Sequence, residues 1–138
     1  MKRLFLVLCA FGLVLSLCNL QAASTGRKEK AAKAAKRGPL VHMVAFKFKP
    51  ETSAAQIKEI EQAFAALPSK IPVILSYETG TNISPEKHDK GFTHGFILTF
   101  ANDKDRDAYL VHPAHQDFGK LVGPTLADVF VIDFKSAK

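Results

Sequence analysis

The sequence predicts one α+β domain built on a four-stranded antiparallel sheet with helices on one face. Three observations lead to this fold class. The chain has 138 residues, enough for one ordinary domain and not two. Four stretches show the apolar patterns of strands, and stretches with helical spacing lie between them. Their order is strand, helix, strand, then strand, two short helices and strand.

The segment before the domain is predicted to be a secretory signal over residues 1–23. Lys2 and Arg3 form a basic head, residues 4–17 are almost wholly apolar, and small residues follow where a signal peptidase could cut. The apolar run is too short to span a bilayer comfortably. We therefore expect an exported protein, periplasmic or secreted, without a transmembrane segment after processing. Leu17 occupies the position where a lipid-attachment signal needs a small residue, so lipidation of Cys18 is not expected.

Both cysteines, Cys9 and Cys18, lie in this signal. A mature chain without thiols excludes disulfides, cysteine metal ligands and thiol catalysis.

The basic charge of the chain is concentrated in a linker over residues 24–38, which is rich in Ala and Lys and has no large apolar residue. Residues 39–138, the predicted domain, hold 11 basic and 12 acidic residues, so a nucleic-acid-binding domain is not indicated. The linker is either a solvated spacer or a contact for acidic lipid headgroups, polymers or a protein partner.

The first half of the domain is predicted to be strand, helix, strand. Residues 41–48 alternate, with His42, Val44, Phe46 and Phe48 on one face. Ser53 and Gln56 form a capping box, and apolar residues then recur at helical spacing up to residue 67, before Pro68. Residues 71–80 are predicted to be the second strand and residues 82–91 a surface loop.

The second half repeats the order with a divided helix. Residues 92–100 are predicted to be a strand that places His94, Phe96, Leu98 and Phe100 on one face. Asn102 can cap a helix that runs to about residue 110, and Pro113 begins another that ends at Val122. Residues 129–134 are predicted to be the last strand.

This order predicts a ferredoxin-like fold. Its helices cover one face of the sheet only. On the other face the sequence places Met43, Ala45, Val129 and Val131, so that face is expected to be partly apolar. A second copy would cover it, and we predict a homodimer in which two sheets pack face to face as an α/β barrel.

Proton-transfer groups are concentrated between residues 109 and 119. Pro113 suits the first turn of a helix, which places His112 at the helix mouth and His115 one turn further on. Tyr109 ends the preceding helix, and Phe118 and Gly119 are expected to supply an apolar wall and a gap. The segment is a candidate acid/base pocket.

Residues 40–134 resemble the stress-responsive A/B barrel (Dabb) family. The resemblance is carried by residues 41–48, by Gly91-Phe92-Thr93-His94, by the motif Tyr109-Leu110-Val111-His112-Pro113-Ala114-His115 and by Val131-Ile132-Asp133-Phe134. It implies a dimeric barrel. Most members have no established activity, some plant members are stress-associated oligomers, and one relative is a plant polyketide cyclase that closes a ring by an aldol reaction without a cofactor.

Matching that cyclase implies roles for individual residues. Tyr109 and His115 fall on its catalytic pair, His42 on the histidine of its first strand, and Phe118 and Gly119 on its pocket wall. The sequence departs at Phe64, where the cyclase has a pocket tyrosine, and at Leu126, where it has a tryptophan. We expect His115 and Tyr109 as the catalytic residues. A small apolar or aromatic molecule would contact His42, Phe46, Phe64, His94, His112, Phe118 and Gly119.

Three functions stay open at this point. His115 could act as a base and Tyr109 as an acid in a cofactor-free proton transfer, cyclisation or lyase step. Alternatively, Tyr109 and His115 tie two helices together in a non-enzymatic stress or envelope protein, with His112 as a cap. A cofactor-independent oxygenase rests on fold analogy alone. A metal site of His42, His94, His112 and His115 is not expected, because no carboxylate or cysteine follows a diagnostic spacing.

Overall fold

The computed structural model describes residues 38–137. The predicted signal and almost all of the predicted linker lie outside the described residues. The elements, in order, are β1 (Leu40–Phe48), α2 (Ala54–Ala65), α3 (Leu67–Lys70), β2 (Ser76–Thr81), β3 (His94–Phe100), α4 (Asp103–Leu110), α5 (Pro113–Val122), a 3-10 turn η1 (Gly123–Thr125) and β4 (Leu126–Lys135). Within this range, no helix is long and apolar enough to cross a membrane.

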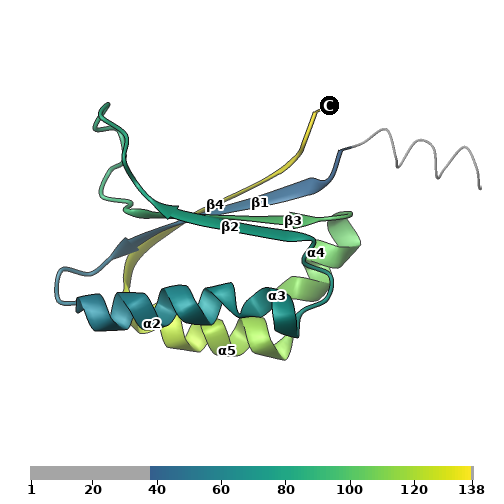
Figure 1. The fold of residues 1–138 in the computed structure, drawn as a ribbon, viewed down its shortest axis with the longest axis horizontal. Coiled ribbons are helices and arrows are strands. Elements are labelled where there is room, and N and C mark those ends of the chain that lie inside the picture. Colours follow the sequence, from purple (N-terminus) through teal and green to yellow (C-terminus); the bar gives the residue numbers. More distant parts are fainter. Residues whose placement is uncertain (1–37, 138) are drawn as a thin grey trace, which may run out of the picture. The chain divides into compact units, whose positions relative to one another are not determined.

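The four strands form one antiparallel sheet in the order β2-β3-β1-β4. The helices lie together on one side of it, and the other side is left open (Figure 1). This is the ferredoxin-like arrangement that the order of elements predicts. The connection between β2 and β3 rises on the open side of the sheet (Figure 1).

Helices α2 and α4 begin where the predicted capping residues place them. The Ser53 hydroxyl accepts a hydrogen bond from the Gln56 amide, and the Gln56 side chain accepts one of 2.9 Å from the Ser53 amide, so the predicted capping box is present. Asn102 caps α4 by accepting from the Asp105 amide at 3.1 Å. Pro68 does not end the helical region; it lies in the first turn of α3, where its missing N–H costs nothing.

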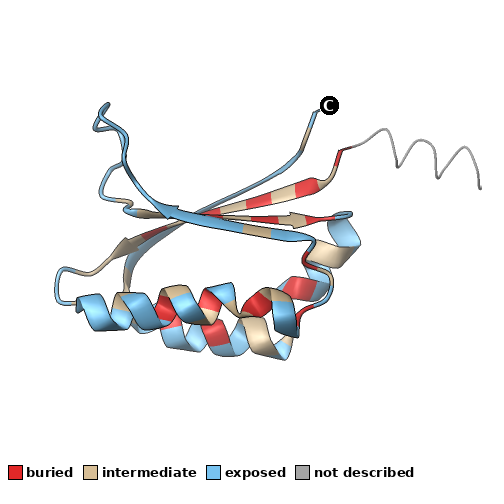
Figure 2. Ribbon diagram, viewed as in Figure 1, coloured by how far each residue is buried: buried red, intermediate tan, exposed pale blue. Residues whose placement is uncertain are grey.

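The core lies between the sheet and the helices, where the buried residues of both layers face each other (Figure 2). Alternate residues of β1 and β3 enter it, as the period of a strand requires. Helices α2 and α5 bury Ile60, Phe64, Phe118 and Val122, each pair four residues apart on one helical face. The faces predicted for the first and third strands are therefore confirmed.

Two details of the sequence interpretation are wrong. The second strand begins at Ser76 and not at residue 71. Ile71 and Ile74 instead enter the core from a turn in which the Ile74 amide donates to the Ile71 carbonyl at 3.1 Å. The last strand is also longer than predicted and starts at Leu126.

The face assigned to the last strand also needs correction. Val129 lies opposite Phe46 and Val131 opposite Val44, so both valines are on the helix side of the sheet. The outward apolar residues of β4 are Phe130, Ile132 and Phe134, opposite Ala45, Met43 and Val41. The prediction took the wrong one of two apolar faces, because this strand is apolar on both.

Candidate functional site

Three of the predicted residues meet at one end of the sheet. Tyr109 ends α4 with its side chain buried, and its ring centroid lies 4.2 Å from that of His115 on α5. The ring of His42, on β1, meets Tyr109 edge to face at 5.8 Å. The short turn between α4 and α5 brings Tyr109 and His115 together, and the inward face of β1 supplies His42. We call Tyr109, His115 and His42 the Tyr/His corner.

His115 is held by its own turn. Its Nδ1 donates a hydrogen bond of 3.1 Å to the carbonyl of Leu110, which leaves the lone pair on Nε2. Burial lowers the pKa of His115, and the nearby His42 lowers it further. The hydrogen bond to the Leu110 carbonyl raises the pKa and so opposes these two effects, of which burial is the larger. The half-buried imidazole is therefore neutral at pH 7 and has one nitrogen able to accept a proton.

Tyr109 has the opposite character. Its side chain is almost fully enclosed, and burial raises its pKa well above the ordinary value for a phenol. The hydroxyl therefore stays protonated and remains a hydrogen-bond donor. A neutral imidazole and a protonated phenol in contact are a base and an acid in the protonation states that general acid–base chemistry requires.

The sequence interpretation missed two residues that support this corner. His42 Nδ1 donates to Asp133 Oδ1 at 2.6 Å, across the β1–β4 pair in which the two residues are direct neighbours. The other oxygen of that carboxylate pairs with Arg106 of α4. The sequence did contain a signal for this contact, because Asp133 is a carboxylate in the largely apolar strand β4. On the helix side of the sheet such a group needs a hydrogen-bond partner.

Two other predicted residues take different places. His112 is the N-cap of α5, and its Nδ1 accepts a hydrogen bond of 3.2 Å from the Ala114 amide. Gly119 is exposed, and a Cβ built on it would meet no atom within 4 Å. It follows Phe118, which is buried, so it is turned about 100° away from the core side of α5. The expected gap beside the corner is therefore open solvent.

The predicted aromatic wall is a packed cluster. Phe64 is 1% exposed, and its ring lies 4.5 Å from Phe96, 4.6 Å from Phe118 and 5.9 Å from Phe46, centroid to centroid. These rings occupy the space between sheet and helices next to the Tyr/His corner. Phe64 therefore fills the interior at the position where the sequence departs from the cyclase pattern.

His94 lies at the other end of the sheet. It is paired with Phe46 at the start of β3, whereas Phe100, which contacts Tyr109, ends that strand. Its Nε2 lies 3.5 Å from Glu61, and its ring packs against Phe48. The four histidines considered for a metal site are thus divided between two places. In residues 38–137 no three His, Cys, Asp or Glu side chains are grouped as metal ligands.

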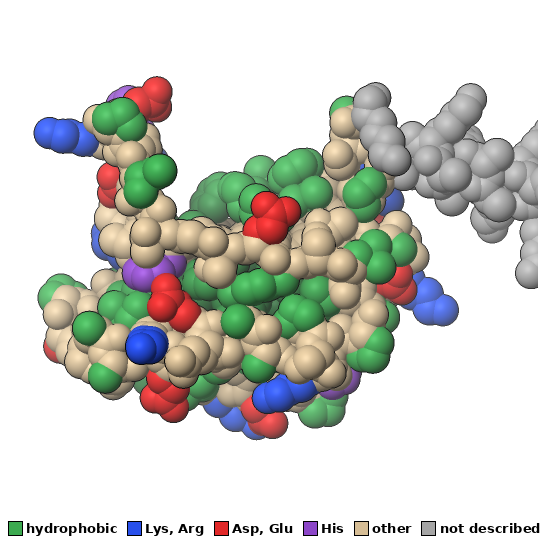
Figure 3. Space-filling model, in the orientation of Figure 1, with side chains coloured by type: hydrophobic (Ala, Val, Ile, Leu, Met, Phe, Trp, Pro, Cys, Tyr) green, Lys and Arg blue, Asp and Glu red, His purple; other side chains and the backbone are tan. Residues whose placement is uncertain are grey.

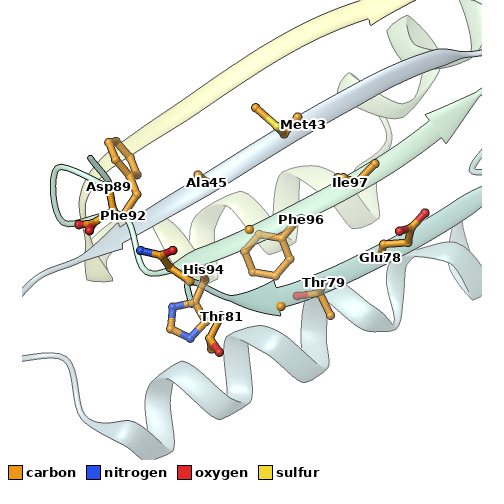
Figure 4. Close-up of a pocket in the computed structure, with 13 residues that line it drawn as sticks. Met43, Ala45, Glu78, Thr79, Thr81, Asp89, Phe92, His94, Phe96 and Ile97 are labelled. Atoms are coloured by element: carbon orange, nitrogen blue, oxygen red, sulfur yellow. The ribbon is translucent and has the colours of Figure 1, made fainter. Parts of the chain in front are cut away.

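A cavity of about 480 Å³ lies on the opposite, open face of the sheet. Met43, Ala45 and Ile97 border it from above the strands, whereas Phe96 and His94 point to the helix side (Figure 4). Gly80 and Gly95, which are direct neighbours on β2 and β3, form part of its floor. Sequence reasoning did not identify this hollow, although facing glycines in two strands are a signal for a close approach.

The fold and the corner define a ferredoxin-like α+β protein in which a buried tyrosine contacts a half-buried histidine of the last helix. A family model described as "Stress responsive A/B Barrel Domain" matches residues 40–136. The chain belongs to this family, Dabb, as the motifs in its strands and in residues 109–115 predict.

Two curated relatives illustrate the range of the family. The chain is 32% identical over 99 residues to the stress-response A/B barrel domain-containing protein HS1 of Arabidopsis thaliana, covering 72% of this chain and 91% of HS1. It is 27% identical over 97 residues to olivetolic acid cyclase of Cannabis sativa, covering 70% of this chain and 96% of the cyclase.

Solved structures agree with the fold. A hydroxynitrile lyase from Passiflora edulis matches with a TM-score of 0.68 and 25% identity over 72% of this chain and 94% of the lyase. A structure described as a dimeric ferredoxin-like protein of unknown function from Jannaschia sp. matches with a TM-score of 0.64 and 26% identity, over 72% of this chain and all of that one.

Proposed function

We propose that the protein catalyses a cofactor-free proton transfer at a carbon next to a carbonyl group, with His115 as the base and Tyr109 as the acid. The observation that carries the proposal is the 4.2 Å contact between the two rings, with His115 Nδ1 committed to the Leu110 carbonyl. The substrate class is a small apolar or aromatic carbonyl compound, because the groups around the corner are aromatic rings.

In this mechanism the Nε2 lone pair of His115 takes the proton from carbon. The electron pair of the broken C–H bond moves onto the carbonyl oxygen, and the Tyr109 hydroxyl donates a hydrogen bond to that oxygen as its charge develops. The resulting enolate carbon can then attack a second carbonyl and close a ring. Asp133 and Arg106 act indirectly, because they hold His42 against the Tyr109 ring.

Two relatives are named as enzymes, olivetolic acid cyclase and a hydroxynitrile lyase, and their names guide the choice of test substrates. The purified protein is incubated in D₂O with aryl ketones and β-diketones, and deuterium uptake at carbon is followed by NMR. A second assay follows the cleavage of an aromatic hydroxynitrile to its aldehyde. His115→Gln and Tyr109→Phe are expected to lower the rate about 100-fold or more.

His88→Gln is the matched control, since His88 is an exposed histidine in the β2–β3 connection. It is expected to leave the rate unchanged. Equal rates in all three variants, or no turnover of any probe by the unaltered protein, would overturn the proposed chemistry.

A second part of the proposal concerns assembly and location. We propose a homodimer formed through the open face of the sheet, which exposes Phe130, Ile132 and Phe134, and solved relatives are described as dimeric. We also propose export by the signal over residues 1–23, with the basic linker free to contact acidic material. Light scattering tests the homodimer. Mass spectrometry of the N-terminus after secretion tests the export by the signal, and a full-length protein would contradict the export.

One observation favours a non-enzymatic stress or envelope protein instead. Phe64 fills the interior between sheet and helices, so a substrate must reach His115 from the outer side of the α4–α5 corner. If no imidazole signal of the protein moves with any carbonyl probe in NMR, the Tyr/His corner is a structural clamp and the stable dimer is the function. Salt-sensitive binding to anionic vesicles, lost on deletion of residues 27–37, would then identify the linker as its tether.

A further inference from the structure

A second group of polar side chains lies at the edge strand β2, away from the Tyr/His corner. Tyr77, Thr79 and Thr81 are alternate residues of β2, and Thr81 is paired with His94, so all are on the helix side of the sheet. Figure 4 shows His94, Thr79 and Thr81 on the side that faces α2. From α2, Glu61 places its Oε1 3.5 Å from His94 Nε2. We call Tyr77, Glu61 and His94 the edge cluster.

The hydroxyl of Tyr77 is buried without a hydrogen bond. Among residues 38–137 it is the one enclosed side-chain nitrogen or oxygen atom that has no partner. Thr79 lies close enough to affect it, but not in hydrogen-bond geometry. A buried polar group without a partner destabilises the fold, so native proteins keep few of them. The Tyr77 hydroxyl is therefore a candidate for binding a group from outside the chain.

Burial also decides what the Tyr77 hydroxyl can do. It raises the pKa of Tyr77, the Thr79 hydroxyl opposes this effect, and the Glu61 carboxylate adds to it. The phenol therefore keeps its proton and can donate a hydrogen bond. Glu61 has the complementary character, because its carboxylate oxygens are acceptors and its side chain is 39% exposed.

Aromatic rings surround the edge cluster. The ring of Tyr77 lies 5.4 Å from that of Phe64, and the ring of His94 meets Phe48 edge to face at 5.1 Å. In the space-filling view, a histidine and an acidic side chain lie together between the sheet and α2, beside a seam of hydrophobic side chains (Figure 3). The edge cluster thus combines one free donor and one exposed acceptor with an apolar wall.

We propose that the edge cluster binds a small neutral hydroxyl compound with an aromatic body, whose O–H donates to Glu61 and whose oxygen accepts from Tyr77. Glu61 would repel a ligand carboxylate, and an ammonium group would leave the Tyr77 proton without an acceptor. A hydroxyl group is donor and acceptor at once, so it satisfies both side chains. Glu61, the exposed member, turns outward to admit the ligand.

This site is separate from the Tyr/His corner. The packed rings of Phe64, Phe96 and Phe118 fill the space between sheet and helices, and Tyr77 contacts Phe64 from the side of the edge strand. The inference therefore goes beyond the proposed proton transfer and does not depend on it. Binding at the edge cluster and turnover at His115 are measured separately, so either proposal can fail alone.

Ligands that share one ring and differ in their head group test the chemistry. Benzyl alcohol, benzylamine, benzoate and toluene are titrated into the full chain, and the imidazole signals are followed by NMR. Benzyl alcohol is expected to move the His94 signals, with a Kd about tenfold or more below those of the other three. Equal affinities for benzyl alcohol and toluene would overturn the hydrogen bonds. Shifts confined to His115 would overturn the location.

Two substitutions test the residues. Tyr77→Phe removes only the unpartnered hydroxyl, so it is expected to raise the melting temperature of the free protein and to weaken benzyl alcohol binding about tenfold or more. Glu61→Ala, at an exposed position, is expected to weaken the alcohol by a similar factor and to leave toluene unchanged. Tyr109→Phe, which alters the other tyrosine of the chain, is the matched control and should keep the affinity. A lower melting temperature for Tyr77→Phe, or unchanged affinity in either variant, would overturn the site.

Discussion

The imidazole of His42 is joined to its cross-strand neighbour Asp133 by a hydrogen bond of 2.6 Å from Nδ1 to Oδ1. His42 is buried, and Arg106 occupies the second oxygen of the same carboxylate. This chain of contacts runs from the α4 surface to the buried ring of Tyr109. It fixes one side of the Tyr/His corner to the edge strand β4.

Asp133→Ala is expected to lower the free energy of unfolding by about 1–3 kcal/mol, because it leaves a buried imidazole N–H without its acceptor. Urea denaturation measures the change. Asp117→Ala is the matched control, since Asp117 pairs on the surface with Lys120 at 2.8 Å, and such a pair contributes about 0–1 kcal/mol. Equal losses in both variants would show that the His42–Asp133 bond does not stabilise the fold.

His112 allows capping to be separated from ligand binding. His112→Ala removes the acceptor for the Ala114 amide and is expected to destabilise the protein by about 1 kcal/mol, whereas His112→Asn keeps a good N-cap and is expected to restore stability. Thermal unfolding followed by circular dichroism gives both values. If His112 also binds substrate, as its position in the sequence motif suggests, the Asn variant will regain stability without regaining turnover.

Phe64 is expected to control access to the interior. Phe64→Ala removes a ring in contact with Phe96 and Phe118, and is expected to cost about 3–5 kcal/mol of stability. The apolar space so created should bind benzene, which would raise the melting temperature of the variant but not of the unaltered protein. Val111→Ala, at a 69% exposed position, should change stability by less than about 0.5 kcal/mol.

If Phe64→Ala proves too unstable to purify, Phe64→Leu makes a smaller cavity and keeps the comparison possible. A variant as stable as the unaltered protein, with no response to benzene, would mean that neighbouring rings close the gap.

The sequence alone was sufficient for the parts of the fold that depend on local pattern. The strand alternation at His42 to Phe48, the Ser53 capping box and the Asn102 cap all operate within a few residues, and the structure confirms each. The pattern could not decide between two apolar faces of β4, because Val129 and Phe130 are equally suited to burial. Only the pairing register with β1 settles which of them faces the helices.

For the candidate site too, the sequence was sufficient only for the part that depends on residues close together in the chain. Tyr109 and His115 are neighbours because one short turn joins their helices, and that spacing is visible in the sequence. His94 was grouped with them because it lies on the correct face of its strand, but it is at the other end of that strand. Asp133 was missed because its contact with His42 joins residues far apart in the chain.

The pH dependence of stability provides the last test of the Tyr/His corner. Burial lowers the pKa of His115 in the folded state, so the unfolded chain binds the proton more readily. The stability contributed by neutral His115 is therefore fully present above the ordinary histidine pKa of about 6.5, and is lost as the pH falls from there through the lowered folded-state pKa.

His115→Gln removes this contribution, so the free energy of unfolding of this variant should change less with pH just below about 6.5. Urea titrations at a series of pH values measure the two slopes, and His88→Gln should keep the slope of the unaltered protein. Identical slopes for His115→Gln and the unaltered protein would show that this imidazole titrates as if in water, and would remove the reason to regard its burial as keeping it a neutral base.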